Sequence, residues 1–170
     1  MTQPPTIPPT FHLICGATGA GKTTYALRLQ ERIGGLHFSI DEWMVGLFSP
    51  DKPASMSIAW MVERVARCEA QILKLALQSG RQGLPAILDL SFLRAESRAR
   101  FTTAAEQAGL GCALHVLDVP AETRWQRVEQ RNAGKGETYS LQVTRPMFDF
   151  IETLWQPPGQ AERAAYPALP

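Results

Sequence analysis

The feature that most constrains the fold is an apolar segment, a glycine-containing loop and a helical segment that follow one another directly. Residues 11–15, Phe-His-Leu-Ile-Cys, follow a run of prolines and have the length of a buried strand. The loop of residues 16–23 comes next, and residues 24–33 then have a helical pattern that ends at Gly34-Gly35. The sequence therefore predicts a strand, a tight loop and a helix in immediate succession.

The loop matches the pattern G-x-x-x-x-G-K-[ST], in which main-chain amides surround a phosphate group. Glycine suits such a loop because it accepts a positive φ and has no Cβ to hold an anion away. The first N–H groups of the following helix have no partner inside it, and the helix dipole adds roughly half a positive charge there. We expect the phosphates of ATP to contact Gly16, Ala17, Thr18, Gly19, Ala20, Gly21, Lys22, Thr23 and Thr24.

Two side chains of the loop have specific expected roles. Lys22 is expected to reach the β- and γ-phosphates, and the Thr23 hydroxyl to ligate Mg²⁺. A dinucleotide-binding G-x-G-x-x-G pattern is excluded, because it would require glycine where Thr24 stands. The remaining alternative is a glycine-rich turn that binds nothing, and a chance match to the pattern is rare, on the order of one in a few hundred such chains.

Composition limits the possible classes of protein. A chain of 170 residues is enough for one domain with a full core, and the formal net charge of +1 counts against a nucleic-acid partner. Three cysteines in apolar settings predict reduced thiols in a cytoplasmic protein. Because no apolar run approaches the length of a membrane span, we expect no membrane partner. The proline-rich residues 1–10 are predicted to be a flexible leader rather than a signal peptide.

Strand and helix patterns alternate along the rest of the chain. The expected strands are residues 36–40, 85–90 and 112–119. The expected helices start near Ser57, Arg94, Pro120 and Thr144, and Gly80 is expected to end the first of them. Residues 44–56 are expected to form an irregular loop, and residues 133–143 a mobile flap. This alternation predicts an α/β fold, a three-layer domain with a mainly parallel sheet. Ligands in such folds bind at the carboxyl ends of the strands, where the loop, Asp41 and Asp89 are all expected.

Two aspartates that end predicted strands are candidates for chemistry. Asp89 ends an apolar strand, the position of an acid that holds Mg²⁺ or its water shell, although an aspartate there can also cap a turn. Asp41 ends the preceding strand and is the candidate base that accepts the proton of an attacking hydroxyl. The alternative for Asp41 is a helix cap or turn residue, and the adjacent Glu42 is a weaker candidate for the base.

Arginines form a second group of candidates. Arg124, Arg127 and Arg131 are spaced by three and four residues and therefore share one helix face just before the flap. Arginines on a closing flap can neutralise charge in phosphoryl transfer, and Arg127 and Arg131 are the preferred pair. The alternative is an ordinary solvated face. Arg98 is either a contact to an anionic substrate group or part of a structural salt bridge.

Aromatic and histidine side chains are less informative. Trp43, Phe48 and Trp60 border the predicted loop after Asp41 and line either a substrate pocket or the core. The three histidines, His12, His37 and His115, lie within predicted strands, so we interpret them as core or edge residues without a chemical role.

These motifs together resemble small bacterial P-loop kinases, the group related to zeta toxins, chloramphenicol phosphotransferase and AAA-labelled predicted kinases. The residues that carry the resemblance are Gly16 to Thr23, Ser39-Ile40-Asp41, residues 87–93 with Arg98, residues 119–131, and Phe148 to Pro158. The resemblance implies a parallel sheet of order 2-3-1-4-5 and ATP·Mg²⁺-dependent transfer to a small hydroxyl compound. It also implies Asp41 as the base and Arg127 and Arg131 as lid arginines.

The chain departs from that group at two places. A fifth strand is doubtful because Ala161 to Pro170 is short and contains Pro167 and Pro170, so the sheet has either four strands or a degenerate fifth. Trp43 stands near Asp41, where relatives often carry an arginine that contacts the substrate. We expect one kinase-like domain over residues 11–162 and a tail over residues 163–170.

The sequence therefore predicts a kinase that transfers a phosphoryl group from ATP to a hydroxyl of a small molecule. Two alternatives remain open at this point. One is a kinase acting on a nucleotide or on a nucleic-acid 5′-hydroxyl. The other is a nucleotide-dependent switch or binding protein with little turnover. No pattern in the sequence identifies the acceptor or the oligomeric state.

Overall fold

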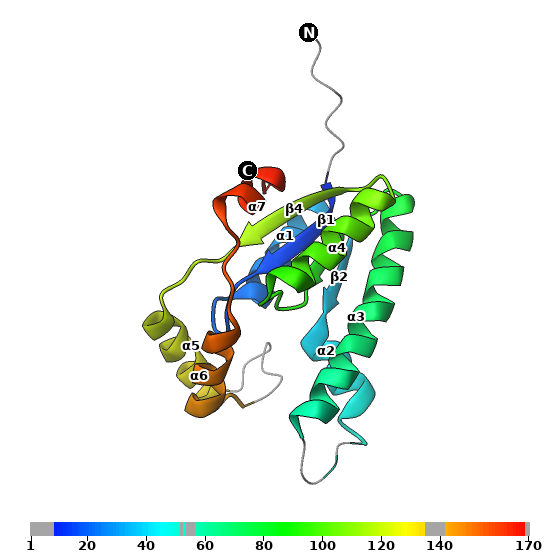
Figure 1. Cartoon of the computed structure of the whole chain (residues 1–170). Coiled ribbons are helices and arrows are strands. Elements are labelled where there is room, and N and C mark those ends of the chain that lie inside the picture. Colours follow the sequence, from blue (N-terminus) through cyan, green and yellow to red (C-terminus); the bar gives the residue numbers. More distant parts are fainter. Residues whose placement is uncertain (1–8, 52, 54–56, 135–141, 169–170) are drawn as a thin grey trace.

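The computed structural model describes residues 9–51, 53, 57–134 and 142–168 (Figure 1). The strands are β1 (Pro9–Cys15), β2 (Leu36–Ser39), β3 (Ala86–Asp89) and β4 (Gly111–Val116). The helices are α1 (Lys22–Ile33), α2 (Ile40–Phe48), α3 (Ile58–Arg81), α4 (Ala95–Gln107), α5 (Ala121–Gly134), α6 (Arg145–Leu154) and α7 (Gln160–Ala165). None of these described helices is long and apolar enough to cross a membrane.

The described strands form one parallel sheet of order β2-β3-β1-β4. Leu13 of β1 lies between Leu88 of β3 and Leu114 of β4, so the middle of the sheet is apolar on both sides of β1. The predicted α/β fold class and the strand order 2-3-1-4 are confirmed. A fifth strand, which was doubtful from the sequence, is absent from the described residues.

The chain after α6 covers the outer edge of β4 without forming a strand. Residues 160–165 fold into α7, and the Leu114 amide of β4 donates a single backbone hydrogen bond of 2.9 Å to the Tyr166 carbonyl. Pro167 follows directly, and a proline has no N–H to continue a strand ladder. In the described part of the chain, the edge of β4 is therefore covered through one backbone hydrogen bond and is not extended by a further strand.

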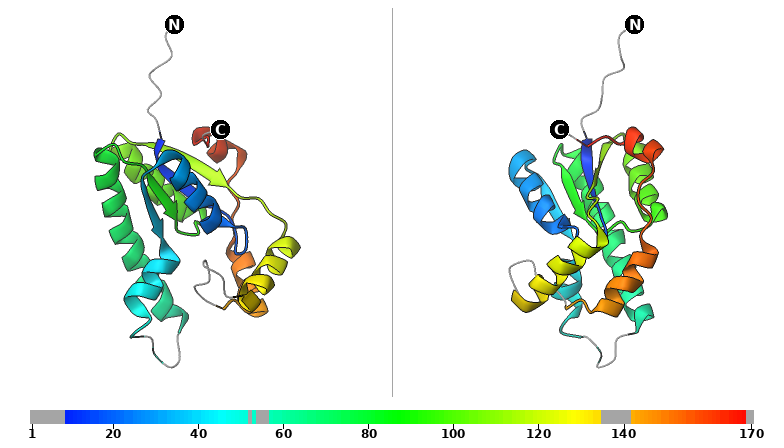
Figure 2. Two further views of the ribbon diagram at one scale, coloured as in Figure 1. Left: turned by 180° about the vertical axis from the view of Figure 1, so that it is seen from behind. Right: turned by 90° about the vertical axis from the view of Figure 1, so that its left-hand side faces the viewer.

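Helices cover both faces of the sheet and make a three-layer domain. Ile14 and Ile87 point to one face and pack with Ala26 and Leu29 of α1. The alternate strand residues, including Leu13 and Leu88, point to the other face and form the main core with α3 and α4. Figure 2 shows α1 on one side of the sheet and α4 on the other. This arrangement leaves the carboxyl ends of the strands open to ligands.

The predicted irregular loop over residues 44–56 is wrong in its first part, because α2 extends from Ile40 to Phe48. The Ser39 side chain accepts a hydrogen bond from the Glu42 amide and caps the helix. Two acidic residues in the first turn favour the positive end of the helix dipole. The helix continues through Gly46, which lies inside the predicted loop.

The long helix α3 begins directly after Ser57, as predicted, and the Ser57 side chain accepts from the Trp60 amide. The prediction that Gly80 ends this helix is wrong, because the helix continues to Arg81. Gly80 has a packing role instead, because a Cβ there would lie 2.6 Å from Cδ1 of Leu110. Glycine at this position lets the helix approach the turn before β4.

Candidate active site

The loop between β1 and α1 has the backbone of an anion site. Gly19 has a φ of +80°, and a Cβ at this position would lie only 2.5 Å from the Arg124 carbonyl oxygen. Gly21, with a φ of 91°, is the N-cap of α1, and no side chain caps this helix. Serine or threonine side chains cap α2, α3 and α6, whereas α4 and α7, like α1, have no side-chain cap. The first amides of α1 are therefore free of side-chain caps and can bind an anion.

Lys22 lies at the start of α1 and is surrounded by charges of both signs. Its ammonium group donates a hydrogen bond of 3.4 Å to the Ala17 carbonyl across the loop. Burial lowers the pKa of Lys22, the carboxylates of Asp89 and Asp41 oppose that shift, and Arg131 adds to it. The structure thus brings the predicted loop lysine, both predicted aspartates and one predicted arginine into a single electrostatic environment.

Thr23 and Asp89 form the candidate magnesium site. The Thr23 hydroxyl donates to Oδ2 of Asp89 at 2.7 Å. Burial raises the pKa of Asp89, while Lys22 and the bond from Thr23 oppose that shift. A buried carboxylate beside a hydroxyl fits a divalent cation, since hard oxygen ligands suit Mg²⁺ and the cation would offset the cost of burying the charge.

The described residues hold no cluster of three or more His, Cys, Asp or Glu side chains that could bind a metal by themselves. A magnesium ion at Thr23 and Asp89 would therefore take its other ligands from phosphate and water oxygens. Mg²⁺ is commonly bound in this way, with one or two protein ligands. The pair fits the predicted role in a nucleotide site rather than a cation cage built from protein alone.

His37 of β2 was not predicted to lie at the site. Its Nε2 lies 3.9 Å from Oδ2 of Asp89 and has no hydrogen-bond partner among the described residues. The other two histidines lie in the interior, as predicted. Nδ1 of His12 is 3.0 Å from Nε2 of His115, and the Tyr25 hydroxyl is 2.8 Å from Nδ1 of His115.

Asp41 lies in the first turn of α2, directly after β2. Its side chain is exposed and lines a groove of about 1290 Å³. Its carboxylate also acts on the pKa of Lys22 and Asp89. Asp41 therefore lies between the phosphate loop and the groove, which is the position expected of the predicted base.

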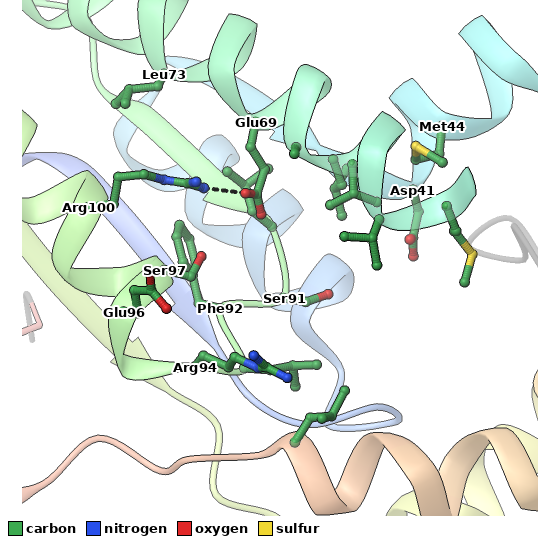
Figure 3. A pocket seen from close by; sticks show the side chains of 18 of the residues that line it. Asp41, Met44, Glu69, Leu73, Ser91, Phe92, Arg94, Glu96, Ser97 and Arg100 are labelled. Atoms are coloured by element: carbon green, nitrogen blue, oxygen red, sulfur yellow. Dashed lines mark hydrogen bonds and ion pairs between the residues drawn. The ribbon is translucent and has the colours of Figure 1, made fainter. Parts of the chain in front are cut away.

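The groove runs between α2 and α3 on one side and the β3–α4 connection with α4 on the other (Figure 3). Phe48 and Trp60 line it, whereas Trp43 packs against the core. The ring centroids of Phe48 and Trp60 are 6.3 Å apart in an edge-to-face arrangement. Two of the three aromatic residues that were candidates for a pocket therefore line it, and the partly buried Trp43 packs against the core without lining the groove.

Arg124 has a structural role. It is buried, and its guanidinium donates to both carboxylate oxygens of Glu152 at 2.6 and 2.5 Å. It also donates to the Thr18 carbonyl at 3.1 Å and to the Val119 carbonyl at 2.8 Å. Arg124 thereby ties the phosphate loop to α5 and α6.

Arg127 and Arg131 lie beside the loop and have few partners. Nη1 of Arg127 lies 3.5 Å from the Ala20 carbonyl oxygen and 4.0 Å from the position that a Cβ of Gly21 would occupy. Nε of Arg131 is buried and has no hydrogen-bond partner among the described residues. A buried donor without a partner is costly, and a phosphate oxygen would satisfy it. Most of the predicted flap, residues 135–141, lies outside the described residues, as do residues 1–8 of the predicted leader.

Arg98 is part of a structural salt bridge, one of the two alternatives from the sequence. Its side chain is 1% exposed and donates to both carboxylate oxygens of Glu162 at 2.6 and 2.9 Å. It also donates to the carbonyls of Phe92 at 3.1 Å and Gln156 at 2.9 Å. With all these partners, Arg98 is not available to bind a substrate.

The three cysteines are free thiols; Cys15 and Cys68 are buried and Cys112 is partly buried. Burial raises the pKa of Cys15 and of Cys112 to about 12. Thiols with so high a pKa are poor nucleophiles at neutral pH. None of the three takes part in the candidate site.

The sheet order, the phosphate loop and the acid that ends β3 together define a P-loop NTPase domain. Residues 11–150 match the protein family described as AAA domain, and the chain belongs to this family. A search of curated proteins found no match.

Solved structures support the same fold at low sequence identity. Kti12 of Chaetomium thermophilum in complex with ADP-AlF3 is similar with a TM-score of 0.68 and 18% identity over 94% of this chain and 87% of that one. A gluconokinase from Sinorhizobium meliloti 1021 is similar with a TM-score of 0.62 and 15% identity over 92% and 80% of the two chains.

A chain of the Pnkp1/Rnl/Hen1 RNA repair complex is similar with a TM-score of 0.62 and 17% identity. The match covers 87% of this chain but only 44% of that chain, so this protein spans less than half of that neighbour's length. At these identities the likeness shows the fold alone.

Proposed function

We propose that this protein is an ATP-dependent kinase that transfers a phosphoryl group to a hydroxyl of a small molecule. The observation that carries the proposal is the position of Asp41 between the phosphate loop and the groove. Its carboxylate interacts with the loop residue Lys22 and lines the groove at the same time. A nucleotide-binding protein without an acceptor has no need for a base at this junction.

The residues have complementary roles in the proposed transfer. The loop amides and Lys22 hold the phosphates of ATP, and Thr23 with Asp89 would hold Mg²⁺, which shields phosphate charge when bound. The acceptor oxygen forms a bond to the γ-phosphorus while the bond from that phosphorus to the β,γ-bridging oxygen breaks. The bridging oxygen keeps the electron pair as ADP leaves, and Asp41 takes the hydroxyl proton.

Arg127 and Arg131 would act on the charge that is transferred. The guanidinium of Arg127 lies beside the loop, and Arg131 is close enough to act on the pKa of Lys22. Nε of Arg131, which has no hydrogen-bond partner among the described residues, is a donor that a phosphate oxygen can satisfy. Arg124 lacks this freedom because Glu152 and backbone carbonyls bind its guanidinium. The proposed division therefore assigns one arginine of α5 to structure and two to the reaction.

The test combines ATP binding with an ADP-release screen over hydroxyl metabolites, antibiotics and nucleosides. We expect Lys22→Ala to weaken ATP binding, and Asp41→Asn to keep ATP affinity but to lower transfer roughly 10²- to 10⁴-fold. Glu42→Gln is the matched control, since Glu42 is the neighbouring acid on α2 but does not line the groove. Unchanged ATP affinity in Lys22→Ala would refute the binding site, and full activity in Asp41→Asn would refute the base.

The same screen tests the alternative of a nucleotide-dependent switch. Tight ATP binding with no phosphorylated product for any acceptor would support that alternative and contradict the kinase. Release of ADP that depends on one acceptor, and that is lost in Asp41→Asn, would exclude it.

A further inference from the structure

The groove beside Asp41 is large and its walls are mostly apolar. Its volume of about 1290 Å³ exceeds the several hundred Å³ typical of pockets for small metabolites. Met44 and Phe48 of α2, Met61 and Val65 of α3, and Leu90 after β3 contribute apolar surface. A ligand with many hydroxyl groups would leave several of them against these walls without partners, at a free-energy cost for each.

The charged side chains of the groove do not favour an anionic ligand. Among the described lining residues there are three carboxylates, Asp41, Glu69 and Glu96, and two arginines, Arg94 and Arg100. Arg100 is already bound to Glu69, a pair that Figure 3 shows at one end of the groove. With more carboxylates than arginines, the lining lacks the surplus of positive charge that a phosphate-bearing acceptor requires.

Ser91 is held at the groove by an unusual turn directly after β3. The Phe92 amide donates to the Leu90 carbonyl at 2.9 Å, which makes Ser91 the centre of a three-residue γ-turn with a φ of 68°. Phe92 also has a positive φ, of 42°. Two successive non-glycine residues in this region are strained, and such strain persists only where the surroundings enforce it.

Two neighbours of Phe92 enforce the turn. The Phe92 side chain is 1% exposed and packs edge-to-face against Phe101, with ring centroids 5.2 Å apart. The buried guanidinium of Arg98 donates to the Phe92 carbonyl at 3.1 Å. Phe92 is therefore anchored on both its side chain and its backbone, and Ser91 is fixed in place as a consequence.

Figure 3 shows the side chains of Ser91 and Asp41 pointing into the same opening from different elements. Ser91 lies just after β3 and Asp41 lies in the first turn of α2, so the two come from different walls of the groove. A hydroxyl that entered the opening could accept a hydrogen bond from Ser91 and donate its own to Asp41. The rest of the molecule that carries this hydroxyl would lie against the apolar walls.

We propose that the groove binds an uncharged, mainly apolar alcohol, whose reactive hydroxyl is held between the Asp41 carboxylate and the Ser91 hydroxyl. The proposal rests on the kinase function proposed above and names its class of acceptor. In the transfer, Asp41 takes the proton of the acceptor hydroxyl while the acceptor oxygen bonds to the γ-phosphorus and ADP leaves. Ser91 orients that oxygen and exchanges no proton with it.

The first test is the series of straight-chain primary alcohols from ethanol to octan-1-ol, with ATP as donor and ADP release as readout. We expect kcat/KM to rise about fourfold for each added methylene, the factor that corresponds to burying one CH₂ group. Xylitol, gluconate and adenosine 3′-monophosphate should show no release above the rate without acceptor. Transfer to one of these, with no dependence on the length of the alcohol, would refute the proposed class while leaving the kinase function intact.

Calorimetry with octan-1-ol in the presence of a non-hydrolysable ATP analogue separates the two proposals. Binding of octan-1-ol without transfer to any acceptor would refute the kinase function and support the apolar ligand. A failure of octan-1-ol to bind, with transfer to xylitol, gluconate or adenosine 3′-monophosphate, would refute the apolar ligand and support the kinase.

A matched pair of variants on α3 tests the position of the ligand. Val62 lines the groove and is 61% exposed, whereas Leu75 is 41% exposed on the same helix and does not line it. We expect Val62→Glu to lower kcat/KM for octan-1-ol at least tenfold without changing ATP affinity, and Leu75→Glu to change neither. Equal effects of the two substitutions would refute the placement of the alcohol in the groove.

Two substitutions at Ser91 separate its hydroxyl from the conformation of its backbone. Ser91→Ala and Ser91→Gly both remove the hydroxyl, but only glycine adopts the positive φ without strain. We expect both to lower kcat for octan-1-ol by a similar factor, with a higher unfolding temperature for Ser91→Gly alone. Wild-type kcat in Ser91→Gly would show that only the turn matters and would refute the contact with the acceptor.

Discussion

The Thr23 hydroxyl donates a hydrogen bond of 2.7 Å to Oδ2 of Asp89, although the two residues are 66 positions apart in the chain. The bond joins the first turn of α1 to the carboxyl end of β3. The helix α1 follows β1 through the loop, and β1 and β3 are neighbouring strands of the sheet. A hydroxyl and a carboxylate are the kinds of oxygen ligand that Mg²⁺ prefers. Their proximity follows from the sheet order, which places β3 directly beside the strand that leads into the loop.

Removal of the Thr23 hydroxyl is expected to abolish the effect of magnesium on ATP binding. In Thr23→Val the metal would lose one protein ligand, whereas Thr23→Ser keeps the hydroxyl and serves as the control. The measurement is ATP affinity by calorimetry with Mg²⁺ and with EDTA. We expect Mg²⁺ to strengthen binding in the wild type and in Thr23→Ser, and to have at most a small effect in Thr23→Val. Equal strengthening in all three proteins would contradict the assignment.

The sequence predicted the parts of the site that depend on local pattern and on the order of the strands. The loop and Asp41 lie just after strands and Asp89 ends one, so a parallel sheet brings all three to one edge irrespective of the details of packing. The groove was not predictable in this way. Its walls come from α2, α3, α4, α6 and the connection between β3 and α4, and its shape depends on how these elements pack, which no local pattern encodes.

The roles of the arginines show the same limit. Arg124, Arg127 and Arg131 have the spacing of one helix face, but only the fold places Glu152 against the first of them. Arg98 is another example, because its partner Glu162 is 64 residues away in the chain and lies at the end of the predicted domain. Long-range ion pairs leave no periodic signal, so sequence alone left both roles open for Arg98.

Substitutions of two arginines on α5 are expected to affect different properties, stability for Arg124 and the reaction rate for Arg131. Arg124→Ala would leave Glu152 partly buried without its partner, and we expect unfolding free energy to fall by about 2 to 3 kcal/mol. Arg131→Gln would remove a positive charge of α5 that acts on Lys22 of the phosphate loop, and it is expected to lower kcat at least tenfold with little change in stability. Urea denaturation and ADP-release kinetics on both variants check this. A stability loss in Arg131→Gln as large as that in Arg124→Ala would contradict the division of roles.

The ion pair of Arg98 and Glu162 is expected to stabilise the turn that holds Ser91. A double-mutant cycle with Arg98→Met, Glu162→Gln and the double variant measures their coupling. Because Arg98 is 1% exposed, we expect each single substitution to cost about 3 kcal/mol and the double variant to cost less than the sum. Strict additivity of the two effects would show that the pair does not act as a unit.

The buried histidine pair is expected to make the protein less stable in mild acid. His115 contacts His12 and Tyr25, and burial, His12 and Arg32 lower its pKa from 6.5 to about 4. Between pH 6.5 and pH 4 the unfolded chain binds a proton at His115 that the folded protein does not bind, so stability falls as the pH falls. The stability that depends on a neutral His115 is fully present above pH 6.5 and is completely lost below pH 4.

A comparison with His115→Gln isolates this contribution from the titration of carboxylates. From the size of the shift we expect the wild type to lose about 3 kcal/mol more than the variant between pH 7 and pH 4. The measurement is the free energy of unfolding in urea at intervals of half a pH unit. The variant should be less stable than the wild type at pH 7, because glutamine reproduces the hydrogen bonds of the imidazole only in part. Parallel curves for the two proteins would show that His115 is protonated as easily in the folded protein as in the unfolded chain.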